Sequence, residues 1–479
     1  MTELLSPQHG LPRDGELAGL LRVVEAAVTD ADPLSAALLG GPLRLPYADP
    51  KVEAAALARL AEAAEAVEAL KPCHDADDDA DRLALVYGLR RVIAAARPDE
   101  PAGPLLVERH LQLRLLRLLD QPTEGMLDLA EVIEAGPSLL LRARRSPARG
   151  SQVGGRLALE SARRMPALLE ACAGAAAEAR FEIRARVEAA LGMLLQASAE
   201  ESGWLLKEYL PAVPQPLEPV PADPVSTGFG MSLAELESEA EAALAEAVGD
   251  PDGQPDSAVG IVDPAPIFRG GVARAWEVEA EEASLRWGAA PGPSAIVTTA
   301  PGWLTPLVPP LSIWSPGALA PGPIRLLVGS PTGGPMGELV SEADQADFRP
   351  AACQRAGVRR ARLLLPGAEL QQGWRAQVRA AGAGPSNWRT ELAWRAALAL
   401  AAIALTRGRA SIYDAAGLIA AESGFDADQA LLQAMTVAQR PMAALGFIAG
   451  RVTVSRLLSS WSPVRLLSEG PLPAAAFAG

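Results

Sequence analysis

Side chains that could carry out chemistry are few and unevenly placed in this sequence. The chain has three histidines, His9, His74 and His110, and three cysteines without a CxxC pair. No histidine lies beyond residue 110, and none of the three lies beside a nucleophile motif such as GxSxG. His110 is interpreted as a residue on a helix face. We therefore do not expect catalysis that depends on histidine.

The stretch RRARLLLPGAELQQGW, residues 359–374, contains a predicted sharp change of direction in the chain. Pro366 fixes φ and Gly367 accepts positive φ, so this pair predicts a tight corner. The leucines at 363–365 are expected to be buried before the corner, and a helix carrying Glu369 is expected after it. The corner would hold polar side chains next to an apolar run.

Two other motifs do not meet the requirements of known sites. DADDDA, residues 75–80, resembles the start of a calcium loop, but Ala80 stands where the loop needs glycine. We expect a solvated helix start there. The glycine-rich run at 328–337 cannot be a P-loop, because none of the three lysines of the chain lies in it. A surface turn is the better interpretation.

The corner and a later segment together resemble a known family. Pro366-Gly367-x-x-Leu370-Gln371 resembles the second half of HExxPGHHLQ, the signature of the bacterial family called domain of unknown function 885. PMAALGFIAG, residues 441–450, resembles the family's PGQALxYxxG, and weaker likenesses at 204–211 and 303–329 follow the same order. The resemblance covers roughly residues 75 to 465. It implies a mostly helical fold similar to that of zinc metallopeptidases, with the signature on a helix that lines the cleft.

The chain departs from this family where the family has its metal chemistry. Arg362-Leu363 stands in place of His-Glu, and Ala368-Glu369 stands in place of His-His. The family's next element, EGWALY, is represented at best by the residues at 386–388. A catalytic zinc needs three protein ligands and a general base. The resemblance therefore implies a member without metal ligands, and we expect no metal and no cofactor.

Tryptophan and charged residues gather in the same part of the chain. Eight of the nine tryptophans lie beyond residue 275. Packing in the core is the first interpretation of these residues. The alternative is an aromatic wall of a ligand cleft. This cleft would be formed by Arg362, Pro366, Gly367, Glu369, Gln372, Trp388 and Arg395.

Three functions remain open from these observations. The leading hypothesis is a catalytically degenerate relative that acts as a binding or scaffolding subunit, with a protein partner such as an intact paralogue. The second is a zinc-independent hydrolase or lyase that reuses the cleft on a small molecule or peptide, with Glu369 or Glu391 as general base. The third is a purely structural helical protein. The hypothesis of an enzyme is the weaker one.

Charge and hydropathy limit the partners and the location. The formal net charge of -15 disfavours a sequence-independent grip on phosphate backbones, so we expect no nucleic acid. The longest apolar run, residues 396–405, is too short to span a membrane. The N-terminus has acidic residues where a secretory signal needs basic ones. We expect a cytoplasmic protein that does not bind membranes.

Periodicity predicts a mainly α fold: a large helical domain, similar to zincins by the resemblance, with a small embedded β-sheet. Residues 1–210 read as amphipathic helices. The spacing of one buried helical face is followed by Met165, Leu168, Leu169 and Cys172, and then by Val187, Leu191, Leu194 and Leu195. Residues 211–258 read as a proline-rich connector followed by a helix that begins at a capping box, Ser232 to Glu235, and ends near Val248. The segment at 259–340 is rich in glycine and proline and holds short strand-like runs at 294–300 and 324–329. Residues 341–465 are expected to be helical and contain the degenerate signature. Residues 466–479 form a tail. We expect these segments to form one compact unit.

Overall fold

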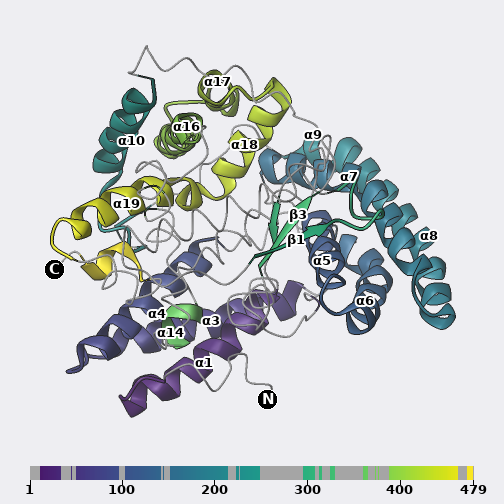
Figure 1. Ribbon diagram of the computed structural model, residues 1–479, viewed down its shortest axis with the longest axis horizontal. Coiled ribbons are helices and arrows are strands. Elements are labelled where there is room, and N and C mark those ends of the chain that lie inside the picture. The colour runs from purple at the N-terminus through teal and green to yellow at the C-terminus, as the bar shows by residue number, and fades with distance from the viewer. Residues whose placement is uncertain are drawn as a thin grey trace.

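The computed structural model describes most of the helical part of the chain and some shorter pieces. The described residues are 11–33, 45, 50–95, 103–141, 144, 151–213, 223–225, 227–248, 295–307, 312–314, 324–328, 360–364, 373, 376, 388–461 and 472–477. Helices dominate these residues, which confirms the mainly α class (Figure 1). No helix among them is both long and apolar enough to cross a membrane.

The helices of the first half run from α1 to α9. Their bounds are α1 Gly15–Ala31, α3 Pro50–Ala69, α4 Ala76–Ala95, α5 Gly103–Arg117, α6 Pro122–Leu140, α7 Gln152–Ala177, α8 Phe181–Trp204, the π-helix Leu205–Tyr209 and α9 Leu210–Ala212. The helical turn at α9 contains Pro211, where the proline-dense sequence predicts no helix. This expectation is wrong at the first proline, because the helical backbone continues directly from the π-helix through Pro211 to Ala212.

The second half combines a small sheet with further helices. Their bounds are α10 Leu233–Val248, β1 Ala295–Thr299, β2 Ser312–Trp314, β3 Ile324–Val328, α14 Arg360–Leu364, α16 Trp388–Thr406, α17 Ile412–Ser423, α18 Ala427–Gln439, α19 Pro441–Leu458 and the 3-10 turn Ala474–Phe477. The capping box that predicts α10 is present: the Ser232 backbone N–H donates to Glu235 Oε2 at 2.7 Å. The amide of Glu235 donates in return to Ser232 Oγ at 3.3 Å.

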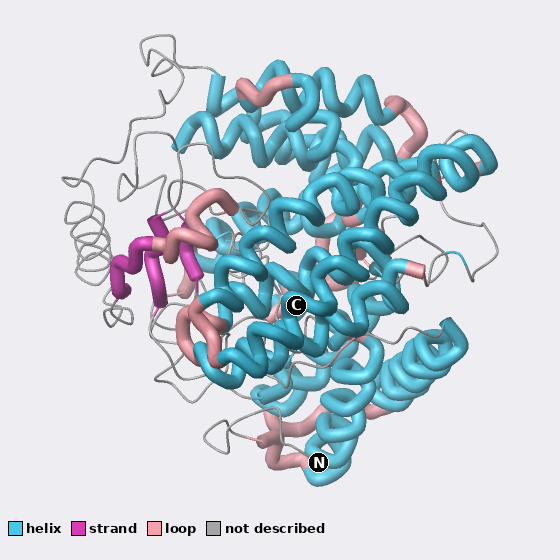
Figure 2. The backbone as a smooth tube through the Cα atoms, turned by 90° about the vertical axis from the view of Figure 1, so that its right-hand side faces the viewer, coloured by secondary structure: helices cyan, strands magenta, loops and turns pink. Residues whose placement is uncertain are grey.

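The three strands form one sheet in the order β1-β3-β2. β1 runs parallel to β3, with Ala295 opposite Ile324, and β2 runs antiparallel to β3, with Ser312 opposite Leu327. Both parallel strands lie in the runs that predict strands, whereas β2 has no such signal in the sequence. Figure 1 shows how small the sheet is beside the helices, and Figure 2 shows the strands at one side of the helical part.

Three large clusters of buried apolar side chains hold the helices together. The first joins α1, α3, α4 and α14. The second joins α5, α6, α7 and α8, with Leu327 of the sheet. The third joins α10, α16, α17, α18 and α19. Burying apolar surface is the main driving force for these contacts, so the clusters define which helices form a unit.

Helix α7 connects two of these clusters because its buried face changes partner along its length. Its C-terminal part contributes Met165, Leu168 and Cys172 to the second cluster, on the face that the sequence spacing predicts. Its N-terminal residues Val153 and Leu157 belong to the third cluster instead. On α8 the same spacing rule is correct for Leu194 but wrong for Leu195, which is 46% exposed.

The segment of the predicted corner lies between the first and third clusters. Ala361 and Leu364 of α14 are buried in the first cluster, and Ala376 is buried in the third. Between them, Gly373 approaches Gly450 of α19 so closely that an added Cβ atom would overlap the Gly450 carbonyl group. The lack of a side chain at position 373 is therefore a packing requirement.

We expect Gly373→Ala to destabilise the protein by about 2 kcal/mol or more, because overpacking against backbone cannot be relieved by a side-chain rotation. The measurement is the free energy of unfolding in urea. The matched control is Gly417→Ala in α17, where nothing lies within 4 Å of an added Cβ atom. This control should be neutral or stabilising by up to about 1 kcal/mol. Equal effects of the two changes would contradict the close approach.

Candidate functional site

The structure places only some of the residues that the sequence predicts as a site. Pro366, Gly367, Glu369 and Gln372 lie outside the described residues, as does the side chain of Trp388 at the start of α16. The predicted corner and its helix therefore stay predictions. Arg362, Glu391 and Arg395 are described, and each has defined partners.

Arg362 is buried and held by carboxylates of α4. Its side chain is 4% exposed, and its Nε donates to Asp81 Oδ1 at 2.8 Å. Its NH2 group also donates to the Asp77 carboxylate at 3.1 Å and to the Asp77 carbonyl at 3.2 Å. A buried guanidinium with these partners binds two segments of the chain together. This arrangement corrects the prediction that Arg362 contacts a ligand in a cleft.

Part of the acidic start of α4 is a buried structural network, although Asp77 stays exposed. Asp78 is 2% exposed and accepts hydrogen bonds from the backbone N–H groups of Arg13 and Asp14, before α1 begins. Asp81 is fully buried against Arg362. The sequence correctly predicts a helix start here, but solvation is wrong for these two residues, because their partners come from distant parts of the chain.

Glu391 and Arg395 form the described polar part of the predicted cleft. They lie one turn apart on α16, 3.9 Å from carboxylate oxygen to guanidinium nitrogen, and both side chains are mostly buried. The Arg395 guanidinium also lies over the rings of Trp394, at 4.4 Å, and of Phe447 in α19, at 5.7 Å. Desolvation strengthens such cation–π contacts. The arginine is thus fixed by a carboxylate and two aromatic rings.

Trp394 adds a donor to this group. Its ring packs edge-on against Phe425 at 5.8 Å, and its Nε1 is buried without a hydrogen-bond partner among the described residues. A buried indole N–H usually has an acceptor. The beginning of α16 therefore brings together a carboxylate, a guanidinium and an available N–H donor. This combination supports binding of a polar group better than it supports a metal.

A second set of buried polar residues lies among α5, α7 and α8, where the sequence gives no functional signal. Glu108 of α5 accepts hydrogen bonds from Arg164, at 2.7 and 3.1 Å, and from Ser161. Gln112 donates to the same carboxylate at 3.2 Å. Because each of these partners is a donor, the carboxylate is well satisfied. We assign Glu108 to packing of the helices and not to catalysis.

His110 lies on the opposite side of α5 and is fully buried. Burial, reinforced by the Arg114 charge, lowers the pKa of His110 to about 3, so the ring is neutral near pH 7. Its Nδ1 lies 2.8 Å from Arg114 NH1. Because a guanidinium only donates, Nδ1 must accept this hydrogen bond. The prediction that His110 is a residue on a helix face is confirmed.

Glu201 of α8 has an unusual environment for a carboxylate. It is fully buried, and its Oε2 accepts a hydrogen bond from Arg144 Nε at 2.9 Å. Its Oε1 has no hydrogen-bond partner among the described residues. Burial raises the pKa of Glu201 to about 7, although the Arg144 charge opposes this shift. Glu201 thus changes charge close to neutral pH.

The metal-ligating residue types do not converge within the described part of the chain. No group of three His, Cys, Asp or Glu residues there has a geometry that could hold a metal ion. His110 uses Nδ1 on an arginine, and His74 is an exposed residue before α4. The expectation that the chain needs no metal rests on the residue types at 362, 363, 368 and 369.

Comparison with known proteins identifies a shared fold but no family. No protein-family model matches the sequence, and no curated protein matches it. The structure is similar to the crystal structure of "the putative lipoprotein from Colwellia psychrerythraea", with a TM-score of 0.66 and 13% identity over 97% of this chain and 98% of that one. It is also similar to "a putative lipoprotein of unknown function from Shewanella oneidensis", with a TM-score of 0.63 and 11% identity over 96% and 98% of the two chains. At these identities the likeness extends to the fold alone.

We expect Arg362→Met to destabilise the protein by roughly 3 to 5 kcal/mol, because Asp81 would remain buried without its cation. The measurement is the free energy of unfolding at pH 7. The control is Arg163→Met, which breaks an exposed ion pair with Glu160 and should cost at most about 1 kcal/mol. Adding Asp81→Asn to Arg362→Met should recover part of the loss. No recovery in the double variant would argue against the ion pair as the cause.

The raised pKa of Glu201 predicts a pH-dependent stability. The native state holds this proton more tightly than the unfolded chain, in which the pKa of the carboxyl is the ordinary 4.5. The contribution to stability is therefore full below pH 4.5 and is lost as the pH rises through about 7. Glu201→Gln removes the titration. We expect the stability of the native protein relative to this variant to fall between about pH 5 and pH 8, measured by urea unfolding. A difference that is constant over this range would contradict the assignment.

Proposed function

We propose that this chain is a catalytically degenerate relative of the family called domain of unknown function 885, and that it acts as a binding or scaffolding subunit. In this proposal the fold is similar to that of zincins, with the small sheet embedded among the helices. The protein would work by association with a partner, for example an intact paralogue, in the cytoplasm. The resemblance at 366–371 and 441–450 motivates the family assignment.

The single observation that carries this proposal is the buried ion pair of Arg362 with Asp81. By the resemblance, Arg362 stands where the family has the first histidine of its signature. A guanidinium has five N–H donors and no lone pair that could bind a metal. Its partners are a buried carboxylate and the first turn of α4. A position that serves chemistry in the family would thus serve stability in this chain.

Retention of the packing around the signature also supports the proposal. The segment that resembles PGQALxYxxG forms most of α19, where Leu445, Phe447 and Gly450 are buried. Gly450 is the residue that Gly373 approaches, just after the stretch that resembles the signature. The contact with the backbone of α19 leaves no room for a side chain at position 373. Loss of the ligand types combined with this tight contact favours a protein whose shape matters more than its former chemistry.

A second candidate is an enzyme without zinc that acts on a small molecule or peptide. The observation in its favour is the group at the start of α16, where Glu391 lies beside Arg395 and the Trp394 indole N–H is without an acceptor among the described residues. A carboxylate could act as general base, with an arginine and an N–H donor to hold an anionic group. Glu369 is the other carboxylate that this alternative would use.

The two candidates differ in what Glu369→Gln with Glu391→Gln should do. If association carries the function, a tagged double variant purified from the host should co-purify with the same proteins as the unchanged chain, at similar yield, because neither carboxylate would contact a substrate. Mass spectrometry of the co-purified proteins is the measurement. The matched control is Glu422→Gln in α17, on a partly exposed part of the surface.

The purified unchanged chain and the purified double variant also test the proposal of a degenerate subunit. Elemental analysis after dialysis should find no stoichiometric zinc, and one retained zinc per chain would overturn the degenerate assignment. A double variant that folds and keeps its partners, yet fails to restore the host phenotype that the unchanged chain restores, would favour the enzyme. Absence of any specific co-purifying protein would remove the support for a subunit.

A further inference from the structure

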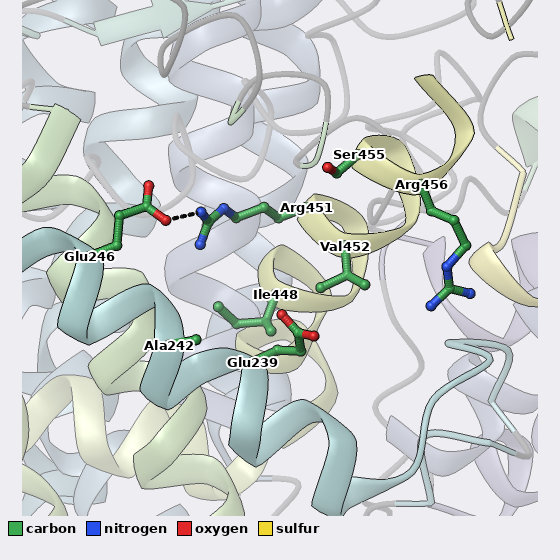
Figure 3. A pocket seen from close by; sticks show the side chains of 8 residues that line it. All are labelled: Glu239, Ala242, Glu246, Ile448, Arg451, Val452, Ser455 and Arg456. Carbon is green, nitrogen blue, oxygen red and sulfur yellow. Dashed lines mark hydrogen bonds and ion pairs between the residues drawn. The ribbon is translucent and has the colours of Figure 1, made fainter. Parts of the chain in front are cut away.

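A groove between α10 and α19 lies on a different face of α19 from the buried contacts near Gly450. Its volume is about 440 Å³, within the usual range of small-ligand sites. Figure 3 shows side chains of both helices directed around this space. The groove is open to solvent and is lined by charged groups above an apolar floor.

The floor of the groove is aliphatic. Ile448 is 1% exposed and belongs to the third hydrophobic cluster, and Val452 lies one turn further along α19 and is partly buried. Ala242 of α10 lines the groove from the other side and leaves room because its side chain is small. An aliphatic group of a ligand would be removed from water on this floor.

One end of the groove is closed by an ion pair inside the protein. Arg451 of α19 donates to the Glu246 carboxylate of α10, and Figure 3 shows this contact spanning the two helices. The pair fixes the spacing of α10 and α19 there. Because the two charges neutralise each other, this ion pair shapes the groove but does not need a charged ligand.

The other charged groups of the groove form no direct ion pair. Glu239 and Arg456 both line it, and neither has an ion pair within 4 Å or a side-chain hydrogen bond with any described residue. Hydrogen bonds from Ser232 lower the pKa of Glu235, which lies in the first turn of α10, and the Arg456 charge adds to this shift. The guanidinium of Arg456 nevertheless keeps its hydrogen-bond donors for a ligand. Elsewhere α10 pairs its carboxylates with available arginines: Glu237 binds both Arg407 and Arg409. Glu239 and Arg456 instead stay apart, and in Figure 3 they extend on different sides of Val452.

We propose that this groove binds an α-amino acid or short peptide that has a free ammonium group, a free carboxylate and an aliphatic side chain. Arg456 would hold the carboxylate, since a guanidinium matches a carboxylate with two parallel hydrogen bonds. Glu239 would hold the ammonium group, and Val452 with Ile448 would receive the aliphatic side chain. The Ser455 hydroxyl, which also lines the groove, adds a neutral donor or acceptor. This site is separate from the signature and does not depend on the proposed function.

The test is isothermal titration of the full chain with L-leucyl-L-leucine and its two blocked forms, the N-acetyl dipeptide and the dipeptide amide. We expect the free dipeptide to bind, and we expect each blocked form to bind at least about 10-fold more weakly, because each loses one charged contact. Glu239→Gln should weaken the free dipeptide but leave the N-acetyl form unchanged. Arg456→Gln should weaken the free dipeptide but leave the amide unchanged.

Two matched variants control for general charge effects. Glu241→Gln changes an exposed carboxylate on α10 outside the groove, and Arg22→Gln changes an exposed arginine on α1. Neither should alter binding. Both groove variants and both controls are surface substitutions that leave the helix packing intact. Lack of binding of the free dipeptide, equal binding of all three probes, or equal effects of groove and control variants would each overturn the proposal.

Discussion

The buried ion pair between Arg362 and Asp81 is the constraint on which the placement of the signature segment depends. It fixes α14 against α4, although the two residues are far apart in sequence. Buried charges are tolerated only with a partner, so neither segment can move independently without a large cost in free energy. The same helix start also binds the chain before α1 through Asp78. One short acidic stretch thus binds both α14 and the chain before α1.

From Leu364 of this anchored helix the chain reaches the third cluster twelve residues later, at Ala376. Leu364 is buried in the first cluster and Ala376 in the third, with Gly373 against Gly450 in between. Close packing makes these contacts sensitive to the volume of a single methyl group. In an active member of the family described by the resemblance, such rigidity would position metal ligands. In this chain it would position a surface for a partner, which is the basis of the proposed subunit.

Electrostatics divide the polar groups of this protein into two kinds. Most buried groups are paired within the chain, such as Glu108 with Arg164. Others are not satisfied by described residues, among them the Trp394 indole N–H, Glu201 Oε1 and His110 Nε2. In the groove between α10 and α19, the exposed Glu239 and Arg456 form no direct ion pair with a described residue. Unsatisfied groups are where a ligand or a proton has an energetic reason to bind.

Local signals in the sequence determined the helical class, the α10 capping box, the parallel strands β1 and β3, and the buried face of α7, because propensity, capping and periodicity act between near neighbours. They also fixed which ligand types the signature region lacks. They did not determine β2, the burial of Asp78 and Asp81, or the role of Arg362 as an anchor. Nor did they indicate the groove that forms where α10 lies beside α19. These features depend on partners distant in sequence, and an aspartate or arginine has the same local pattern whether it faces water or a buried opposite charge. Only the tertiary structure decided which of these side chains face water and which face a buried opposite charge.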